Sequence, residues 1–477
     1  MHLLHSGQGI EEPGASGLSA QPSEQLLRRR RLHAPSVAPT RRGRLYDSAM
    51  ANPRRGRRRW PWVVAGLALV CAVAGAYVYL NRPGDVRNPK AEFVREGPKR
   101  PGADTFSWPL LGFTKDRRRY FPTATVRPPY RKRWSLPGRV LLEFPPVIDR
   151  GFLYLLSDSG TLRAINKETG KVRWKRRLGT LAAASPAAAG GTVYVTLLRR
   201  PGSINGRVAA LDARTGRIRW SSNLSSRSES PPLLDGGVVY FGDEGGSVYA
   251  LRASNGHRLW RYRANGAVKG GPALANGVLY FGDYGGTVHA VDQRTGRGVW
   301  SSGTSGARLG LGSGTFYATP AVAFGRVYIG NTDHRMYSFV ARTGKLAWAR
   351  ETGAYVYGSP SVANVPGIGP TVYVGSYDGN FTAYNARTGD TRWSYDAGGA
   401  ISGGSTIIGG VVYFATLPDT ATTGLDIRRG RRVFHFSDGK FDPAVSDGKR
   451  LYIDGYRTLY AFDPVGGKRA SPAGRGG

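Results

Sequence analysis

The sequence predicts an all-β fold, and a repeat with strand-like content is the first observation behind it. Trp134 and Phe434 bracket the repeat, and successive markers lie 40 to 48 residues apart. Between them, six segments carry a glycine followed four residues later by a tryptophan, at Trp174, Trp220, Trp260, Trp300, Trp348 and Trp393. A period of forty-odd residues with this content is typical of β-propeller blades.

The internal order of each repeat is the second observation. An apolar run such as Val-Val-Tyr-Phe at 238–241 leads into a turn, Asp-Glu-Gly-Gly at 243–246, where glycine can take the positive φ that a hairpin needs. A third strand at 248–251 follows, and a Thr-Gly turn then leads to the tryptophan strand. The runs are apolar on both sides because each blade is stacked between two neighbours. Four strands per repeat are therefore expected, with tryptophan on the outermost one.

The number of repeats is the third observation. Third strands end near residues 166, 212, 251, 292, 339, 385, 426 and 463, which gives eight repeats. The eighth has no tryptophan strand after it, whereas the strand around Trp134 has no repeat before it. A strand from one end of the chain that completes the blade at the other end closes the ring and removes exposed edges. We expect an eight-bladed β-propeller of four-stranded blades, closed by residues 130–136 and preceded by one transmembrane α-helix.

The expected helix covers residues 60–80, which form 21 residues without a charge. At about 1.5 Å per residue this run spans about 31 Å, which matches the hydrocarbon core of a bilayer. Five arginines lie in 54–59, directly before it. The positive-inside rule then predicts a single-pass signal-anchor in the cell membrane, with a cytoplasmic N-terminus and an extracytoplasmic propeller. A cleavable signal peptide is the alternative, although its apolar core usually has only about 7–15 residues.

These features divide the chain into five expected parts. Residues 1–59 are rich in Pro, Ser and Arg without a periodic apolar face, which predicts a disordered basic cytoplasmic segment. The helix at 60–80 is followed by a polar linker at 81–104. The propeller takes up 105–470, and 471–477 form a disordered tail.

The formal net charge is +36 at pH 7. Such a charge favours anionic partners, such as anionic surface polymers or lipids. The alternative is a composition bias spread over solvated faces. No nucleic-acid-binding motif is present, so we expect no nucleic-acid partner. Cys71 is the single cysteine of the sequence, which excludes an intramolecular disulfide and a cysteine-based metal cluster.

The repeated phrase resembles the PQQ-like, or quinoprotein-type, propeller repeat. It reads Val-Tyr-Phe-Gly-Asp-x-Gly-Gly-x-Val-Tyr-Ala-Leu, followed by Thr-Gly-Arg/Lys-x-x-Trp, over roughly residues 105–465. In character the chain is most similar to the propeller subunit of the outer-membrane β-barrel assembly machinery. That resemblance implies a non-catalytic binding or assembly scaffold whose partners are envelope proteins.

The same repeat also occurs in quinoprotein dehydrogenases, which the segments at 108–112 and 119–122 resemble. That branch binds its quinone between a tryptophan and a vicinal disulfide, beside a calcium ion and a catalytic aspartate. This sequence has one cysteine and no Asp-x-Asp-x-Asp-Gly calcium loop. We therefore expect no enzyme, no cofactor, no metal and no catalytic residue. A PQQ-dependent dehydrogenase and an extracellular sensor domain remain the alternatives.

The expected contact site is the mouth of the central channel. In propellers of this type, the segment between one blade's outer strand and the next blade's inner strand lies near the channel. These segments supply candidate ligand or partner contacts: Glu143, Glu229, Lys269, Tyr317, Tyr357, Lys440 and Asp442. A concave site with this mixture of side chains can bind a small polar ligand or a peptide. The alternative is a polar rim that is simply solvated.

Overall fold

The computed structural model describes residues 60–80, 84–96, 108–123, 125–304, 314–441 and 444–466. The chain divides into two compact units, residues 1–73 and 74–477. Helix α1 (Trp60–Leu80) forms over the apolar run predicted to be helical. Within the described part of the chain, no helix has the length and hydropathy that a membrane crossing requires.

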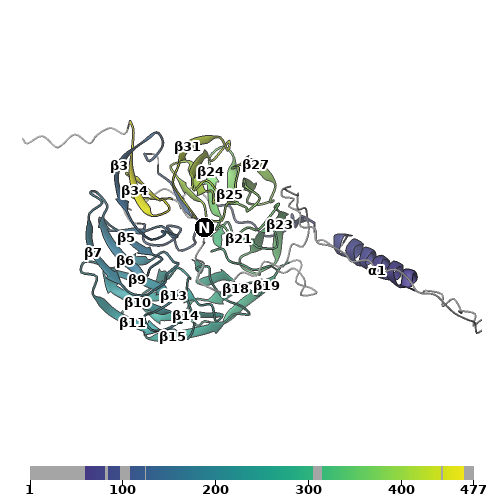
Figure 1. Cartoon of the computed structure of the whole chain (residues 1–477), viewed down its shortest axis with the longest axis horizontal. Helices are drawn as coiled ribbons and strands as arrows, with labels where there is room; N and C mark the ends of the chain where they lie inside the picture. Colours follow the sequence, from purple (N-terminus) through teal and green to yellow (C-terminus); the bar gives the residue numbers. More distant parts are fainter. Residues whose placement is uncertain are drawn as a thin grey trace, which may run out of the picture. The chain divides into compact units, whose positions relative to one another are not determined.

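Eight sheets form the ring in the second unit (Figure 1). Blade 1 contains β4 (Val147–Asp149), β5 (Phe152–Ser157), β6 (Thr161–Asn166) and β7 (Val172–Arg177). Blade 2 contains β8 (Ala187–Ala189), β9 (Thr192–Leu197), β10 (Arg207–Asp212) and β11 (Ile218–Asn223). Blade 3 contains β12 (Leu233–Asp235), β13 (Val238–Gly242), β14 (Ser247–Arg252) and β15 (Arg258–Arg263). Blade 4 contains β16 (Ala273–Ala275), β17 (Val278–Gly282), β18 (Thr287–Asp292) and β19 (Gly298–Gly303).

The second half of the ring repeats the pattern. Blade 5 contains β20 (Ala321–Ala323), β21 (Arg326–Asn331), β22 (Arg335–Val340) and β23 (Leu346–Glu351). Blade 6 contains β24 (Ser361–Val365), β25 (Gly369–Gly375), β26 (Asn380–Asn385) and β27 (Thr391–Asp396). Blade 7 contains β28 (Thr406–Ile408), β29 (Val411–Ala415), β30 (Thr422–Asp426) and β31 (Arg432–Phe436). Blade 8 contains β32 (Ala444–Ser446), β33 (Leu451–Asp454), β34 (Thr458–Pro464) and, from the N-terminal side, β3 (Tyr130–Pro137). The predicted all-β, eight-bladed propeller of four-stranded blades is confirmed.

Ring closure by the N-terminal strand is also confirmed. β3 pairs antiparallel with β34, and Trp134 lies opposite Ala461. The indole Nε1 of Trp134 donates to the Lys167 carbonyl of blade 1 at 3.1 Å. This contact repeats what every internal tryptophan does with the next blade, as when Trp260 Nε1 donates to the Gln293 carbonyl at 3.1 Å. The closing blade is thus equivalent to the others.

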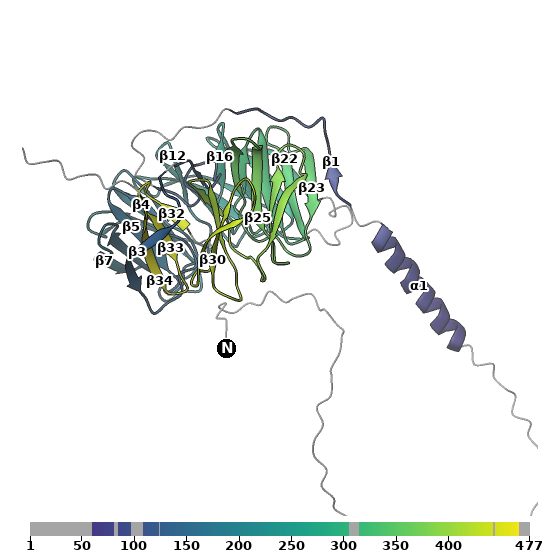
Figure 2. The same ribbon diagram turned by 90° about the horizontal axis from the view of Figure 1, so that it is seen from above.

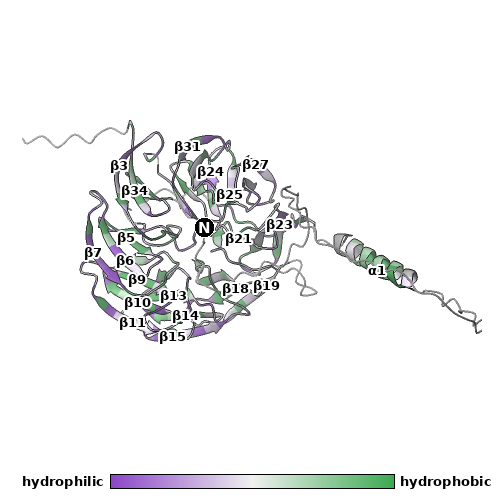
Figure 3. Cartoon of the chain, in the orientation of Figure 1, coloured by the Kyte–Doolittle hydropathy of each residue, from purple (hydrophilic) through white to green (hydrophobic). Residues whose placement is uncertain are grey.

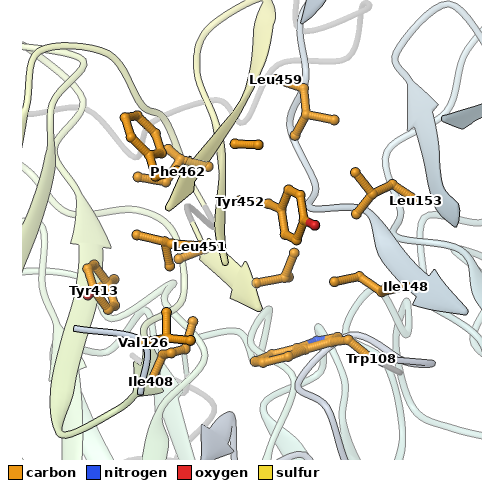
Figure 4. Close-up of a cluster of buried hydrophobic side chains, with 14 of the residues drawn as sticks. Trp108, Val126, Ile148, Leu153, Ile408, Tyr413, Leu451, Tyr452, Leu459 and Phe462 are labelled. Carbon is orange, nitrogen blue, oxygen red and sulfur yellow. The ribbon is translucent and has the colours of Figure 1, made fainter. Parts of the chain in front are cut away.

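A buried apolar cluster seals the join between the last and first blades. Figure 4 shows Tyr452 of blade 8 facing Ile148 and Leu153 of blade 1, with Trp108 beside them, while Leu451 lies on the side toward blade 7. These five side chains are at most 2% exposed. Fully burying an apolar side chain contributes about 1.5–3 kcal/mol, so the join is a core in its own right.

Residues 108–123 and Thr125 wind once around the inside of the ring. The Trp108 N–H donates to the Ile148 carbonyl in blade 1. Inner-strand N–H groups of blades 2, 4, 5, 6 and 7 donate to the carbonyls of Pro109, Lys115, Asp116, Arg118 and Arg119, in that order. Arg117 donates to the carbonyls of Pro231 and Pro232 in blade 3, and Thr125 donates to the Gly448 carbonyl in blade 8. Within it, β2 (Tyr120–Phe121) pairs parallel with β28. The segment therefore contacts all eight blades, and its backbone hydrogen bonds to blades 1, 2, 4, 5, 6 and 7 follow the order of these blades along the chain.

A second N-terminal segment lies on the outside of blade 5. β1 (Val86–Arg87) adds a fifth strand to that blade by pairing with β23 (Figure 2). Phe93 stacks on Phe324, with ring centroids 5.5 Å apart. Residues 84–96, which include β1, fall within 81–104, the stretch expected to be a linker. Contacts with the propeller therefore begin before the expected boundary at residue 105.

Candidate functional site

One position recurs in the loop before the inner strand of every blade, at the end of the ring that we call the mouth. It is the residue four before the inner strand begins, and in blade order it is Glu143, Ala183, Glu229, Lys269, Tyr317, Tyr357, Ser402 and Lys440. Because neighbouring strands within a blade are antiparallel, this loop lies at the same face of the ring as the turn between the second and third strands. Backbone hydrogen bonds join the two, as when the Glu244 N–H donates to the Arg227 carbonyl at 2.8 Å. Six of the seven predicted site residues therefore occupy equivalent positions.

Lys269 is the centre of a charged cluster at this mouth. Its Nζ lies 2.7 Å from Glu229 Oε1 and 3.3 Å from Glu244 Oε1. Arg227 pairs with the other oxygen of Glu244 at 3.2 Å. Burial raises the pKa of Glu229, and the Lys269 ammonium opposes that rise. The Glu229 carboxylate, Glu244 and their two cations thus form one network across blades 3 and 4.

Tyrosine rings continue from this cluster along the mouth. Lys269 Nζ lies 5.0 Å from the ring centroid of Tyr284. Tyr284 contacts Tyr317 at a centroid distance of 6.3 Å, Tyr317 contacts Tyr357 at 5.7 Å, and Tyr357 contacts Tyr377 at 5.0 Å. Burial raises the pKa of Tyr357 to about 12, so its hydroxyl stays protonated at neutral pH. The four rings are half-buried and continue the mouth from blade 4 to blade 6. We call Glu229, Lys269 and these four tyrosines the mouth arc.

A buried guanidinium lies next to the start of the neighbouring inner strands. Arg117 is 1% exposed and donates to the carbonyls of Pro231, Pro232 and Pro272, which directly precede β12 and β16. Its side chain also donates to the Leu111 carbonyl. Burial lowers the pKa of Arg117 to about 9, and the nearby Arg119 adds to this effect. The winding segment thus places a cation, held by carbonyl oxygens, beside the mouth arc.

The other predicted residues lie apart from the mouth arc. Lys440 Nζ lies 4.8 Å from the ring centroid of Tyr456 and 5.5 Å from that of Phe441. Glu143 occupies the equivalent position in blade 1, where the neighbouring Leu142 N–H donates to the Tyr456 carbonyl of blade 8 at 3.1 Å. Asp442 lies outside the described residues. The structure therefore groups Glu229, Lys269, Tyr317 and Tyr357, and leaves Lys440 and Glu143 on the opposite side of the mouth.

Sequence reasoning missed the part of the site that comes from the turns. Glu244, Tyr284 and Tyr377 each follow the turn residue Asp243, Asp283 or Ser376 in the repeated hairpin. A comparison of repeats could have found them, because the position changes from Glu to Tyr inside an otherwise constant turn. Arg117 carries no such signal, since the winding segment is not part of the repeat.

The quinone pocket implied by the enzyme branch does not fit these residues. The repeat tryptophans lie on the outer strands, where their indoles pack on glycines of the next blade, as Trp174 does on Gly216. The aromatic rings at the mouth are tyrosines, and the sole cysteine, Cys71, belongs to α1. Among the described residues, no group of three or more His, Cys, Asp or Glu side chains is arranged to hold a metal ion.

Three solved structures share the fold. BamB from Moraxella catarrhalis matches with a TM-score of 0.57 and 21% identity, covering 70% of this chain and 98% of that one. A europium-containing methanol dehydrogenase matches with a TM-score of 0.63 and 14% identity, covering 76% and 98%. A computationally designed protein, Ika8, matches with a TM-score of 0.57 and 16% identity, covering 69% of this chain and 98% of that one. At these identities the likeness shows the fold alone, which hosts binding proteins, enzymes and designs.

The sequence comparison goes further than the fold. No curated protein matches the sequence. A family model does match, over residues 128–200 and 204–434, and its description is outer membrane protein assembly factor BamB. The matched residues include the ring-closing strand, the repeats of blades 1 to 6 and most of blade 7. The chain therefore belongs to the PQQ-like β-propeller family that this BamB model describes.

Proposed function

We propose that this chain is a non-catalytic scaffold of the cell envelope that binds another envelope protein at the mouth arc. One observation carries the proposal. At the position four residues before each inner strand, eight repeats built on one plan present five residue types: Glu, Lys and Tyr twice each, and Ala and Ser once. Equivalent positions that serve packing, such as the outer-strand tryptophans, stay nearly constant. A position that diverges while the frame stays constant is typical of a binding surface.

The chemistry of the mouth arc suits a protein partner. Tyrosine and arginine are enriched at the centres of protein interfaces, where rigid aromatic rings bury large areas at a low entropic cost. The tyrosines of the mouth arc are half-buried, so each keeps an exposed part for a partner. The family description and the BamB neighbour support a role in envelope assembly.

Anchoring in the membrane is the second part of the proposal. Helix α1 is a 21-residue apolar helix, and five arginines precede it in the sequence. As a sequence pattern this favours a single membrane crossing with the propeller outside the cytoplasm, although no helix among the described residues meets the length and hydropathy of a crossing.

Site-specific photocrosslinking tests the proposed binding site. A photoreactive residue at Tyr317 should crosslink to one or a few envelope proteins in intact cells. The same residue at Ser301, an exposed position on outer strand β19, is the matched control. Equal crosslinking at both positions, or none at Tyr317, would contradict the proposal.

The dehydrogenase alternative is tested directly with the cofactor. Titration of the purified chain with pyrroloquinoline quinone and calcium should give no stoichiometric binding and no dye-linked alcohol oxidation, because the mouth offers neither a tryptophan plate nor a vicinal disulfide. Stoichiometric binding with turnover would overturn the scaffold proposal.

A further inference from the structure

The outer strands of the propeller carry a large net positive charge on one half of the ring only. The outer strands of blades 8, 1, 2 and 3, which are β3, β7, β11 and β15, carry eleven Lys and Arg residues and no Asp or Glu. The outer strands of blades 4 to 7, which are β19, β23, β27 and β31, carry three Arg, one Asp and one Glu. A composition bias would raise the charge of both halves alike. The asymmetry therefore points to a surface, which we call the basic half-rim.

The cations of the basic half-rim are exposed and mostly uncompensated. All eleven side chains are exposed. Within the described part of the chain, Arg133 and Arg219 are the two that pair with an acidic side chain. Arg176 and Arg177 instead donate to backbone carbonyls, of Gly216 and Gly179, which orients a guanidinium without neutralising it. Figure 3 shows the hydrophilic colouring along β7, β11 and β15.

The spacing along these strands suits a linear partner. Alternate residues of a strand lie on one face, about 6.6 Å apart. Lys175 and Arg177 repeat at this spacing on β7, as do Arg261 and Arg263 on β15, whereas Arg133 and Arg173 lie at β-bulges of β3 and β7. Nine of the eleven cations are arginine, whose planar fork binds phosphate through two hydrogen bonds at once.

The shape of the half-rim favours a polymer over a lipid surface. Its cations follow the outer strands of four successive blades, 8, 1, 2 and 3, along the convex edge of the ring. A flexible polymer can follow such an edge from blade to blade, whereas a flat bilayer touches it along a short stretch. The envelope location of that polymer rests on the proposed function, whereas the charge asymmetry does not.

We propose that the basic half-rim binds a linear phosphate-bearing anionic polymer of the envelope, separately from the mouth arc. The measurement uses inorganic polyphosphate as the probe and the full-length chain in neutral detergent, with the dissociation constant determined at several salt concentrations. Wild-type affinity should fall steeply with salt, because the bound polymer releases its counterions.

A charge-matched pair of variants tests the site. The first variant combines Lys132→Gln, Lys175→Gln, Arg258→Gln and Arg261→Gln, which are exposed half-rim residues. The control combines Arg294→Gln, Arg387→Gln, Arg428→Gln and Arg431→Gln, which are exposed residues of blades 4, 6 and 7. Both lose four charges. The half-rim variant should bind polyphosphate at least about tenfold more weakly, and its salt slope should fall by about 3. The control should stay within about twofold of wild type.

Three results would overturn the proposal. Equal losses in both variants would show that net charge alone binds the polymer, and no loss in either would place the binding elsewhere. Vesicles of anionic phospholipid that bind wild type while polyphosphate does not would show a lipid surface. A variant with Tyr317→Ala and Tyr357→Ala should keep full polyphosphate affinity, so failure of the mouth-arc proposal and failure of this one are distinguishable.

Discussion

Glu229 and Lys269 form a pair whose stability depends on both members being present. The carboxylate is 8% exposed, and burial of an ionised carboxylate costs several kcal/mol unless a cation and hydrogen bonds offset it. Lys269 contacts Glu229 and Glu244 together, so its loss leaves two acidic side chains near each other.

Lys269→Met should therefore destabilise the folded state by about 1–3 kcal/mol at pH 8, since it leaves a buried carboxylate without its partner. The pKa of Glu229 is already raised by burial and rises further without the cation. Protonation of Glu229 then removes the buried charge, so the penalty should shrink as the pH falls from 8 to 5. Urea unfolding at the two pH values measures this. Glu229→Gln with Lys269→Met is the control and should recover most of the loss; strict additivity of the single changes would contradict the coupling.

Asp158 gives a second pH-dependent prediction. It follows β5 in the turn of blade 1, and burial raises its pKa to about 7. An unfolded aspartate has a pKa near 4, so between about pH 4 and 7 the folded state holds more protons than the unfolded state. The free energy of unfolding should fall as the pH rises through this window. Asp158→Asn should flatten that fall and be more stable than wild type at pH 8, as thermal unfolding can measure. An unchanged pH profile would contradict the assignment.

The mouth residues show how far single positions can be predicted. The repeat places Glu229, Lys269, Tyr317 and Tyr357 at one rim, because position within a blade follows from the period. Which of these side chains contact one another does not follow from the period. Lys269 meets Glu244 through a turn two strands away in the previous blade, and that distance depends on how far neighbouring blades are rotated.

At the scale of elements, β3 decides whether the ring is closed. Trp134 contributes the same contact as the internal tryptophans, because its indole packs on Gly170 of the next blade. A Cβ at that glycine would lie 2.8 Å from the indole, and its φ of 72° also favours glycine.

Trp134→Ala should cost about 3 kcal/mol, which is typical of removing a large aromatic side chain from a packed site. Trp260→Ala, with the same contacts to Gly296 and Gln293 inside the ring, is the matched control. Similar losses in guanidinium unfolding would place β3 within the cooperative unit. A loss below about 1 kcal/mol at Trp134, beside a full loss at Trp260, would show that the closing strand unfolds independently.

The elements outside the repeat are the ones the sequence could not place. The pairing of β3 was predicted because the last repeat lacks its outer strand and the strand around Trp134 has no repeat of its own. β1 has two residues in a polar stretch, and its pairing with β23 depends on an edge that the repeat leaves open. The winding segment has no periodic pattern, since consecutive residues contact different blades.

At the scale of the whole molecule, the proposed topology has a direct test. Alkaline phosphatase fused after Gly477 should be active, because the arginines before α1 favour a cytoplasmic N-terminus and an exported propeller. A cytoplasmic reporter at the same position is the control and should stay silent. The reverse pattern would place the propeller inside the cell.

The winding segment also has a consequence for how the ring is made. A chain synthesised from its N-terminus releases residues 108–123 and Thr125 before any blade, and their backbone hydrogen bonds to blades 1, 2, 4, 5, 6 and 7 follow the order in which these blades are completed. Each new blade can therefore dock on the winding segment, which is already present. It need not wait for the ring to close, a step with a large loss of chain entropy. The last step pairs β34 with β3, some 330 residues upstream. Until then, the open strand edge of blade 8 is exposed, and this is the stage at which the chain is most prone to aggregate.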